Sequence, residues 1–506
     1  MAKSNVVVAV GTAVQDTDRS KDADLALKAL AGAQPSELQV DDATSARLVK
    51  RIDRYMMPLL CVVYALNFLD KTTLNYAAVM GISAPPLEGG IGLQGNQYSW
   101  LASAFYFGYL VGEWPTTRLL QRFPLGKYIG FNIIAWGAVL CCFAAVNNFA
   151  GALVLRVILG FFESSVTPGF ALLTSQWYTK SEQGMRTGLW FSFNGVAQIF
   201  GGLVAYGVAT GAHGSGYSMA SWKIIFLICG GMTTAFGVVF LCIIPDNQTN
   251  AWWLTKQDRL LAIQRIKGNQ QGIGNRRWKL YQVVEALTDP LSWAFVTYAL
   301  IAMIPNGGLT NFFSPIIRSF GYTAEEALLY GAPGGAVQLV VVTLSGYLGD
   351  RLKNRLLVSS VGLIVAMVGM SLIAALPAEL STGRLAGFYL NQTAICPFVA
   401  ILSLISTNIA GYTKKTTVAA MYLMAYCVGN IIGPQTFRGN SWAPAEFTFI
   451  GCYAVCFFDV IFIWWYCRKR NKEKASRMDV DEGSGMGDKE WLDLTDRENP
   501  NFRYTV

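Results

Sequence analysis

Long apolar runs recur through this 506-residue chain, and each is long enough for a helix to cross a lipid bilayer. More than half of the residues (53%) are apolar and only 14% are charged, which is not the balance of a soluble globular protein. The sequence therefore predicts an all-α polytopic membrane protein with twelve spans. The spans are expected near 55–82, 97–118, 127–147, 150–178, 185–210 and 222–244, and then near 291–317, 325–349, 356–377, 383–411, 415–435 and 445–467.

Basic residues between these runs predict the side of the membrane on which each connecting segment lies. Lys and Arg gather before the first span, in every second connection and after the last span, whereas the other connections carry few charges. Because cytosolic segments are enriched in Lys and Arg, we expect both termini in the cytosol. Five parts follow: a cytosolic tail (1–54), a six-helix bundle (55–244), a cytosolic central loop (245–290), a second six-helix bundle (291–467) and a second cytosolic tail (468–506).

Two predicted spans carry ionisable side chains near the middle of the bilayer. Asp70 and Lys71 are adjacent in the first span, and Arg156 and Glu163 lie seven residues apart in the fourth. Seven residues correspond to about 700° of helical rotation, so Arg156 and Glu163 project from one face of a helix. Each isolated charge would cost roughly 2.5–3.5 kcal/mol at this depth. We therefore expect the four groups to share a hydrated transport pathway or, alternatively, to form structural ion pairs between two helices.

Amide side chains also occur within the spans, with Asn194 and Gln198 in the fifth and Asn430 in the eleventh. Hydrogen bonds between membrane helices contribute about 0.6 kcal/mol each, so such residues can join helices without contacting a ligand. Helix packing and substrate contact therefore remain two interpretations of these amides. Prolines within spans are typical of the broken helices at transporter binding sites, and the spans contain Pro168, Pro305, Pro333, Pro397 and Pro434.

Metal sites, hydrolytic sites and nucleic-acid binding have little support in this sequence. The ten cysteines lie in or beside apolar runs without a Cys-x-x-Cys pair, and His213 is the single histidine. No His-Glu-x-x-His or Gly-x-Ser-x-Gly motif is present. The net charge of +8 is explained by the basic segments that flank the spans. We expect no catalytic residue, no bound metal and no nucleic-acid partner.

Several longer strings resemble a family of transporters. The segment GYLGDRLKNR (346–355) is similar to the G-x-L-x-D-R-x-x-x-R signature of the major facilitator superfamily, although the equivalent segment after the second span has Gln121 where the signature has Asp. The strings NFLDKTTLNYAAVMGI, GNQYSWLASAFYFGYL, FSFNGVAQIFGGL and GNIIGPQTF are similar to the fungal allantoate permease family, in the anion:cation symporter branch of that superfamily. The resemblance implies a major facilitator fold of two six-helix bundles. It also implies proton-coupled transport of small organic anions such as allantoate, nicotinate or pantothenate.

The resemblance assigns roles to the buried charges. In this group an acidic–basic pair in helix 1, and Arg and Glu seven residues apart in helix 4, carry coupling and anion binding. Those positions are Asp70, Lys71, Arg156 and Glu163 here. Lys71 and Arg156 would bind the substrate carboxylate, and Asp70 and Glu163 would carry protons. Many relatives have Arg in place of Lys71, and an ammonium holds a carboxylate as a point charge, without the bidentate grip of a guanidinium.

Further positions follow from the same resemblance. Asn194, Gln198 and Asn430 lie on helices that pack centrally in this fold, so they are expected to contact the substrate. The signature segment is expected to act as a cytosolic ion-pair gate formed by Asp350, Arg351 and Arg355.

We therefore expect an importer of a small carboxylate that is driven by the proton gradient and needs no cofactor. The expected partners are the carboxylate, protons and the lipid bilayer, and the chain is expected to act as a monomer in the plasma membrane or, alternatively, the vacuolar membrane. Two other functions remain open. An exporter of an acidic metabolite would run as a proton antiporter with the same charges, and a nutrient receptor would bind without transporting.

Overall fold

The structure is a computed structural model of the whole chain. It describes residues 41–215, 219–267, 279–352, 354–377, 379–437, 442–478, 494–499 and 501–505. All regular secondary structure in these residues is helical. Residues 1–40 of the predicted N-terminal tail, and residues 268–278 of the predicted central loop, lie outside the described residues.

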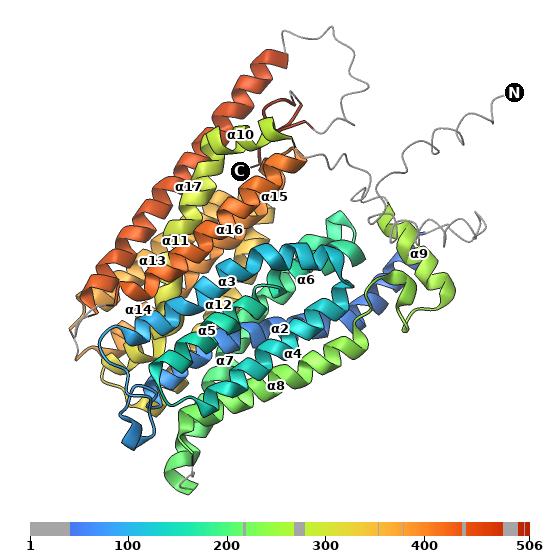
Figure 1. Cartoon of the computed structure of the whole chain (residues 1–506). Helices are drawn as coiled ribbons and strands as arrows, with labels where there is room; N and C mark the ends of the chain where they lie inside the picture. Colours follow the sequence, from blue (N-terminus) through green and yellow to red (C-terminus); the bar gives the residue numbers. More distant parts are fainter. Residues whose placement is uncertain are drawn as a thin grey trace, which may run out of the picture.

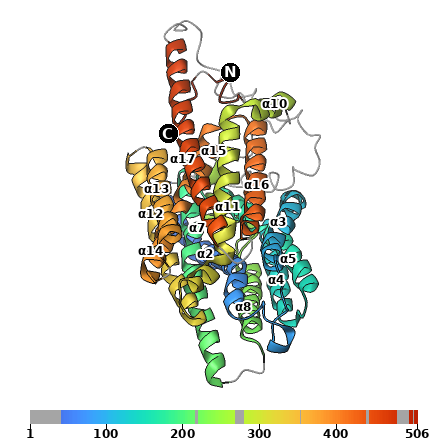
Figure 2. The same cartoon turned by 90° about the vertical axis from the view of Figure 1, so that its left-hand side faces the viewer.

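The helices form two bundles that lie side by side (Figure 1, Figure 2). The first bundle contains α2 (Asp42–Val79), α3 (Gln97–Arg122), α4 (Leu125–Cys142), α5 (Phe149–Glu163), α6 (Val166–Trp177), α7 (Lys180–Ser215) and α8 (Ser221–Ile243). Two short helices, α9 (Lys256–Lys267) and α10 (Leu280–Thr288), follow it. The second bundle contains α11 (Pro290–Ser319), α12 (Ala324–Leu352), α13 (Arg355–Ala375), α14 (Ser381–Asn391), α15 (Ile395–Asn408), α16 (Tyr412–Gln435) and α17 (Ala443–Met478).

The length and composition of these helices confirm the predicted polytopic fold. Within the described residues, eleven helical segments are long and apolar enough to cross a membrane, and α3 is a further long helix of 26 residues. Large apolar side chains remain exposed on the outer faces of the bundles, for example Phe131, Leu203 and Phe458. Exposed apolar faces of this kind are stable where lipid covers them. Because lipid provides this cover, the exposed faces agree with a protein that spans the membrane.

Two of the predicted spans are interrupted in the structure, just before Pro168 and Pro397, which are two of the prolines that the sequence places within spans. α5 ends at Glu163, and the hydroxyl groups of Ser164 and Ser165 donate to the carbonyl oxygens of Phe161 (2.7 Å) and Phe162 (3.0 Å). Such side-chain bonds compete with helix continuation. The next helix tolerates Pro168 because first-turn amides have no intrahelical acceptor.

The same break recurs in the second bundle, where the 3₁₀ turn Gln392–Ala394 separates α14 from α15. Pro397 is the third residue of α15, as Pro168 is of α6. Phe149–Trp177 and Ser381–Asn408 nevertheless each remain one membrane-spanning segment by length and composition, which agrees with the predicted spans 150–178 and 383–411.

At the interface the first span of each bundle meets its equivalent, and the second span of each bundle packs against the fifth span of the other. α2 packs against α11, α3 against α16, and α7 against α12. This pairing is the one that parallel repeats related by an axis along the membrane normal produce. We call the end where α2 begins and α17 ends the basic end, because Arg54, Arg122, Lys127 and Arg186 lie there, and we call the opposite end the far end.

Hydrogen bonds close the interface in the far half of the helices. The Asn75 amide donates to Ser314 Oγ (2.8 Å), and the Ser314 backbone amide donates back to Asn75 Oδ1 (2.8 Å). The Tyr98 hydroxyl donates to the Asn311 carbonyl oxygen (2.7 Å). Each bond joins a helix of the first bundle to α11 of the second. The far end of the protein is therefore closed.

The side chains described next, near the basic end, do not join the two bundles. Arg186, at the start of α7, pairs with Asp53 of α2 at 2.8 Å. Tyr347 and Leu352, in the last part of α12, are exposed. The arrangement is that of a two-bundle protein whose halves meet at the far end.

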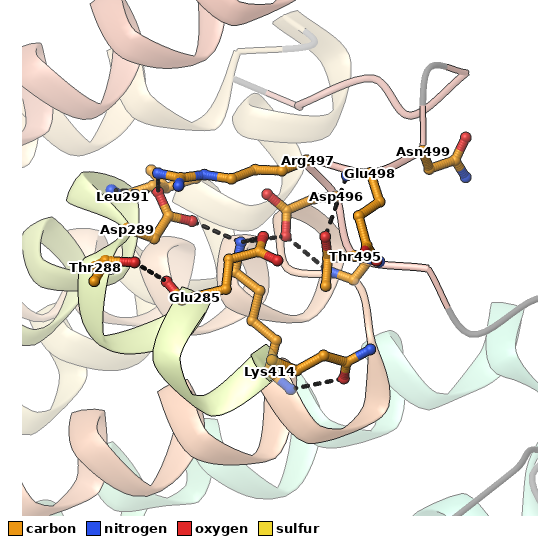
Figure 3. A network of polar contacts seen from close by, with 12 residues as sticks. Glu285, Thr288, Asp289, Leu291, Lys414, Thr495, Asp496, Arg497, Glu498 and Asn499 are labelled. Carbon is orange, nitrogen blue, oxygen red and sulfur yellow. Dashed lines mark hydrogen bonds and ion pairs between the residues drawn. The ribbon is translucent and has the colours of Figure 1, made fainter. Parts of the chain in front are cut away.

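The chain after α17 returns to the second bundle. We call residues 494–499 and 501–505 the C-terminal clasp. The ammonium of Lys414 is fully buried, 2.7 Å from Asp496 of the clasp, 2.7 Å from Asp289 and 2.9 Å from Glu285 (Figure 3). Arg497 of the clasp also pairs with Asp289, at 2.8 Å. These contacts join the clasp to α10, to the start of α11 and to the start of α16.

Further contacts bury the end of the clasp. The Tyr504 hydroxyl donates to Asp496 (2.7 Å), and burial together with that carboxylate raises the pKa of the Tyr504 phenol. Asn408 of α15 donates to the Thr505 carbonyl oxygen at 2.8 Å. The predicted tail 468–506 thus includes the last part of α17, to Met478, and a segment that packs on the bundle.

Candidate functional site

Lys71 lies at the centre of the first bundle, where α2, α3 and α5 meet. Its ammonium is 3.2 Å from Glu163 Oε1 and donates to Asn67 Oδ1 at 3.0 Å. It also lies 5.6 Å from the ring centre of Phe105 and 5.9 Å from that of Tyr109. Lys71 is partly exposed (15%), whereas Glu163 is fully buried. The ion pair predicted between the first and fourth spans is therefore formed by Lys71 and Glu163.

Arg156 lies on α5 two turns before Glu163, with its side chain buried at 1% exposure. Its guanidinium is 6.0 Å from the ring centre of Phe143. Within the described part of the chain, Nε and Nη2 of Arg156 have no hydrogen-bond partner. Arg156 and Lys71 line one small cavity, which we call the Arg156 pocket, together with Ala102, Phe105, Tyr106 and Asn311.

Asp70 faces away from this pocket. Its Oδ2 accepts from the Trp136 indole of α4 (2.6 Å) and from the Thr233 hydroxyl of α8 (2.9 Å). Successive residues of a helix point about 100° apart, so the neighbours Asp70 and Lys71 meet different helices. Two of the four charges, Lys71 and Arg156, therefore line one pocket, Glu163 pairs with Lys71, and Asp70 is held by α4 and α8.

A larger cavity, the central cavity, lies between the two bundles. Gln198 lines it from α7 and Phe68 from α2, one turn before Lys71. The second bundle contributes most of the lining, including the polar residues Asn306, Thr310, Gln338, Asn391, Gln392 and Tyr453 and the aromatic residues Phe313 and Phe388.

The three amides predicted to contact substrate differ in their positions. Gln198 lines the central cavity and donates to the Gly331 carbonyl oxygen at 3.0 Å. Asn430 is fully buried and does not line the central cavity. Its Oδ1 accepts a hydrogen bond from Asn306 Nδ2 at 2.9 Å. Asn194 is buried on α7 and is not among the residues that line either cavity.

The residues of the predicted gate lie at the basic end of α12 and the start of α13. Arg351 is exposed and donates to the Tyr347 hydroxyl at 3.4 Å. Arg355 contacts Ser403 of α15. The side chain of Asp350 lies outside the described residues. Both described arginine contacts lie within the second bundle.

The sequence patterns did not identify several residues of the site. Asn67 stands four residues before Lys71, and that helical spacing is a signal that could have found it. Trp136, Thr233 and Gln338 carry no such signal, because their partners or cavity are distant in sequence. Tyr106 of α3 also lines the Arg156 pocket.

Comparison with known proteins agrees with this architecture. The Major Facilitator Superfamily pattern matches residues 60–434. Transporter C417.10 of Schizosaccharomyces pombe is 40% identical over 92% of this chain and 91% of its own. The allantoate permease of Saccharomyces cerevisiae is 36% identical over 94% and 89%, and the thiamine pathway transporter THI73 of the same yeast is 35% identical over 91% and 86%.

Solved structures show the same fold at low sequence identity. The D-xylose-proton symporter superimposes with a TM-score of 0.62 at 14% identity, covering 81% of this chain and 97% of that one. A bacterial homologue of the lysosomal transporter Spinster, in an inward-facing conformation, gives 0.59 at 18% identity, covering 81% and 96%. This chain therefore belongs to the major facilitator superfamily, within the fungal group that includes the allantoate permease, and it is a multi-pass membrane transporter and not an enzyme.

Proposed function

We propose that this transporter imports a small organic carboxylate together with protons. The observation that carries the proposal is Arg156, a buried guanidinium with two unpartnered nitrogen atoms beside Lys71 in one pocket. A buried charge without a partner is strongly unfavourable, so an anion that enters this pocket is stabilised. Hydrogen bonds between a guanidinium and a carboxylate are about twice as strong as neutral ones. Arg156 is therefore the main partner of the substrate anion, and Lys71 is the second partner.

Glu163 couples proton binding to substrate binding through Lys71. In the structure the two side chains are 3.2 Å apart and neutralise each other. When Glu163 takes up a proton, its attraction for Lys71 falls and the ammonium is free to bind the substrate carboxylate. After the substrate leaves, deprotonation restores the ion pair. This exchange links one proton to one substrate anion.

Asp70 offers a second protonation site on the same helix. Protonation would weaken the hydrogen bonds that Trp136 and Thr233 donate to it, and so loosen the contact of α2 with α4 and α8. One proton with one monovalent anion moves no net charge. A second proton would let the membrane potential add about 2.3 kcal/mol per 100 mV.

The orientation in the membrane follows from charge. Lys and Arg gather at the basic end, so we place that end and both termini in the cytosol, in the plasma membrane or the vacuolar membrane. We infer that the closed far end faces outward, so that this arrangement corresponds to an inward-facing state, and that the carrier acts as a monomer. In the outward-facing state, Asp350, Arg351 and Arg355 would form the cytosolic gate.

The test is uptake by the purified protein in proteoliposomes. Labelled carboxylates, including allantoate and nicotinate, are offered at external pH 5 and pH 7.5 with the interior at pH 7.5. We expect uptake of at least one anion to be stimulated by the acidic exterior and to be lost in Arg156→Ala. Arg118→Ala, which removes an exposed arginine of α3, serves as the control and should retain uptake.

Three results would contradict the proposal. Uptake that is unchanged in Arg156→Ala would remove the assigned anion site. Outward transport of the anion in exchange for protons that move inward would identify the proton-antiport exporter. Binding of the anion without any flux would identify the receptor.

A further inference from the structure

The last helix, α17, continues past the membrane-spanning part of the second bundle at the basic end. It extends past α15 and α16 there (Figure 1, Figure 2). Residues 443–467 contain no Lys or Arg, and the next seven positions hold five basic residues: Arg468, Lys469, Arg470, Lys472 and Lys474. Trp464, Trp465 and Tyr466 come directly before them. Trp and Tyr gather where hydrocarbon meets the lipid headgroups, so the basic residues begin at headgroup level.

The clasp occupies one face of this part of α17. Lys474 donates to the carbonyl oxygens of Asp496 and Asn499 in the clasp. Arg470, one turn earlier on the same face, pairs with Glu473 at 3.1 Å. Two of the five basic residues therefore have protein partners.

The other three basic residues lie together on the opposite face. Arg468, Lys469 and Lys472 are exposed, and they fall within about 100° of one another around the helix. Within the described part of the chain, no ion pair joins any of the three to an acidic residue. Like charges one turn apart on a helix repel each other, so an anionic group beside these three cations is stabilising. By contrast, Arg47 and Arg51 of α2 both pair with Asp258.

Aromatic rings hold two of these cations close to the membrane. The guanidinium of Arg468 lies 4.2 Å from the ring centre of Trp464, and the ammonium of Lys469 lies 5.0 Å from that of Trp465. Side chains of a helix tilt toward its N-terminal end, and the N-terminal part of α17 is the part that spans the membrane. The two cations therefore point toward the lipid headgroups.

An apolar track continues from the cations along the same face of α17. Phe458, Ile461, Phe462 and Trp465 are all exposed, and Trp465 precedes Lys469 by one turn. Their spacings of three, four and seven residues place them in one sector of the helix surface. Exposed rings and aliphatic groups at this depth pack against acyl chains. The face thus presents an apolar surface in the membrane with a cluster of positive charge at the membrane surface.

We propose that this face of α17 binds an anionic phospholipid from the leaflet at the basic end. The headgroup binds at Arg468, Lys469 and Lys472, and the acyl chains lie along Phe458 and Trp465. Charge complementarity selects the headgroup, and the apolar track requires that the ligand also carries acyl chains. The site is separate from the Arg156 pocket and goes beyond the proposed carboxylate import.

The test measures the preference for one lipid over another. The purified full chain in a neutral detergent is mixed with equal amounts of phosphatidylserine and phosphatidylcholine that have the same acyl chains. Native mass spectrometry then gives the ratio of the two lipids bound. A Lys or Arg at an anionic lipid surface strengthens binding about fivefold, so we expect phosphatidylserine to be preferred about fivefold or more.

Variants locate the preference on α17. Replacing Arg468, Lys469 and Lys472 together by Gln should bring the ratio close to one. The control replaces three exposed basic residues of the first bundle, Lys50, Arg54 and Arg118, by Gln and should keep the wild-type ratio. Both lipids are measured on the same protein molecules, so a lower yield of folded variant does not change the ratio.

A soluble headgroup separates a lipid site from a site for small anions. Excess O-phosphoserine, which carries the headgroup charge but no acyl chains, should leave the bound phosphatidylserine in place. Four outcomes would overturn the lipid site: equal binding of the two lipids to the wild type, an unchanged ratio in the α17 variant, an equal loss in the control variant, or displacement by O-phosphoserine. None of them bears on uptake through Arg156.

Discussion

Asp70 and Lys71 are neighbours in the sequence, yet different helices hold them. Lys71 pairs with Glu163 of α5, whereas Asp70 accepts hydrogen bonds from Trp136 of α4 and Thr233 of α8. Each carboxylate therefore has its own environment, and a change at one leaves the contacts of the other in place. Mutations of the residues around one carboxylate should therefore change proton binding at that carboxylate and not at the other.

Trp136→Phe keeps an aromatic ring but removes the N–H that donates to Asp70. Because a donated hydrogen bond favours the ionised form of a carboxylate, Asp70 in the variant should take up a proton at higher pH. We expect the midpoint of the pH–uptake curve to move upward, and the free energy of unfolding to fall by about 1.5–3 kcal/mol because Asp70 Oδ2 keeps only the hydrogen bond from Thr233.

Trp190→Phe is the control for this experiment. Trp190 is buried at 2% exposure, and its indole N–H has no hydrogen-bond partner in the described part of the chain. Its replacement should leave the midpoint in place. An unshifted midpoint in Trp136→Phe would show that Asp70 does not titrate during transport.

At the scale of elements, the two bundles touch where small residues let helices approach closely. A Cβ atom on Gly195 of α7 would lie 2.5 Å from the Gly335 carbonyl oxygen of α12 and 3.0 Å from Leu339 Cβ. Real Cβ atoms do not come this close to backbone, so α7 and α12 cross at a glycine contact. The fourth span of each bundle is also interrupted, just before Pro168 in the first bundle and just before Pro397 in the second.

Gly195→Val should push α7 and α12 apart. Overpacking of this kind costs typically about 1–3 kcal/mol, so we expect a lower melting temperature in detergent and a reduced uptake rate. Gly207→Val places the same side chain on the same helix where nothing lies within 4 Å, and it should be near neutral. Equal melting temperatures for the two variants would contradict the close crossing.

At the scale of the whole molecule, the C-terminal clasp ties together parts of the chain that are far apart in sequence. Lys414 is fully buried among three carboxylates, which come from α10, from the residue before α11 and from the clasp. The clasp thus connects the central loop, the second bundle and the C-terminus at the basic end. Stability of that end depends on residues outside the membrane spans.

Lys414→Met leaves the carboxylates of Glu285 and Asp496 without this cation and leaves Asp289 with Arg497 alone. Removing one partner of a buried ion pair typically costs about 3–5 kcal/mol, so we expect a large fall in melting temperature and earlier proteolysis of the C-terminal segment. Lys415→Met removes the neighbouring lysine, whose ammonium bonds the exposed Ser406 carbonyl oxygen, and should have little effect. A melting temperature of Lys414→Met equal to that of Lys415→Met would show that the clasp is not stabilising.

The sequence by itself determined the spans, the two-bundle organisation and the family. These follow from run length, from the spacing of Lys and Arg, and from strings of residues that are local in the chain. It also identified Lys71, Arg156 and Glu163 as buried charges, because an ionisable residue inside an apolar run is costly in lipid and faces the bundle interior, where it finds a partner or water.

Only the tertiary structure decided which groups meet. Asp70 binds Trp136 and Thr233 across 66 and 163 residues of sequence, and Lys414 binds Asp496 across 82. Helical periodicity gives the face on which a side chain lies but not the helix that covers that face. For this reason the separation of Asp70 from the Arg156 pocket and the position of the clasp depend on how the helices pack.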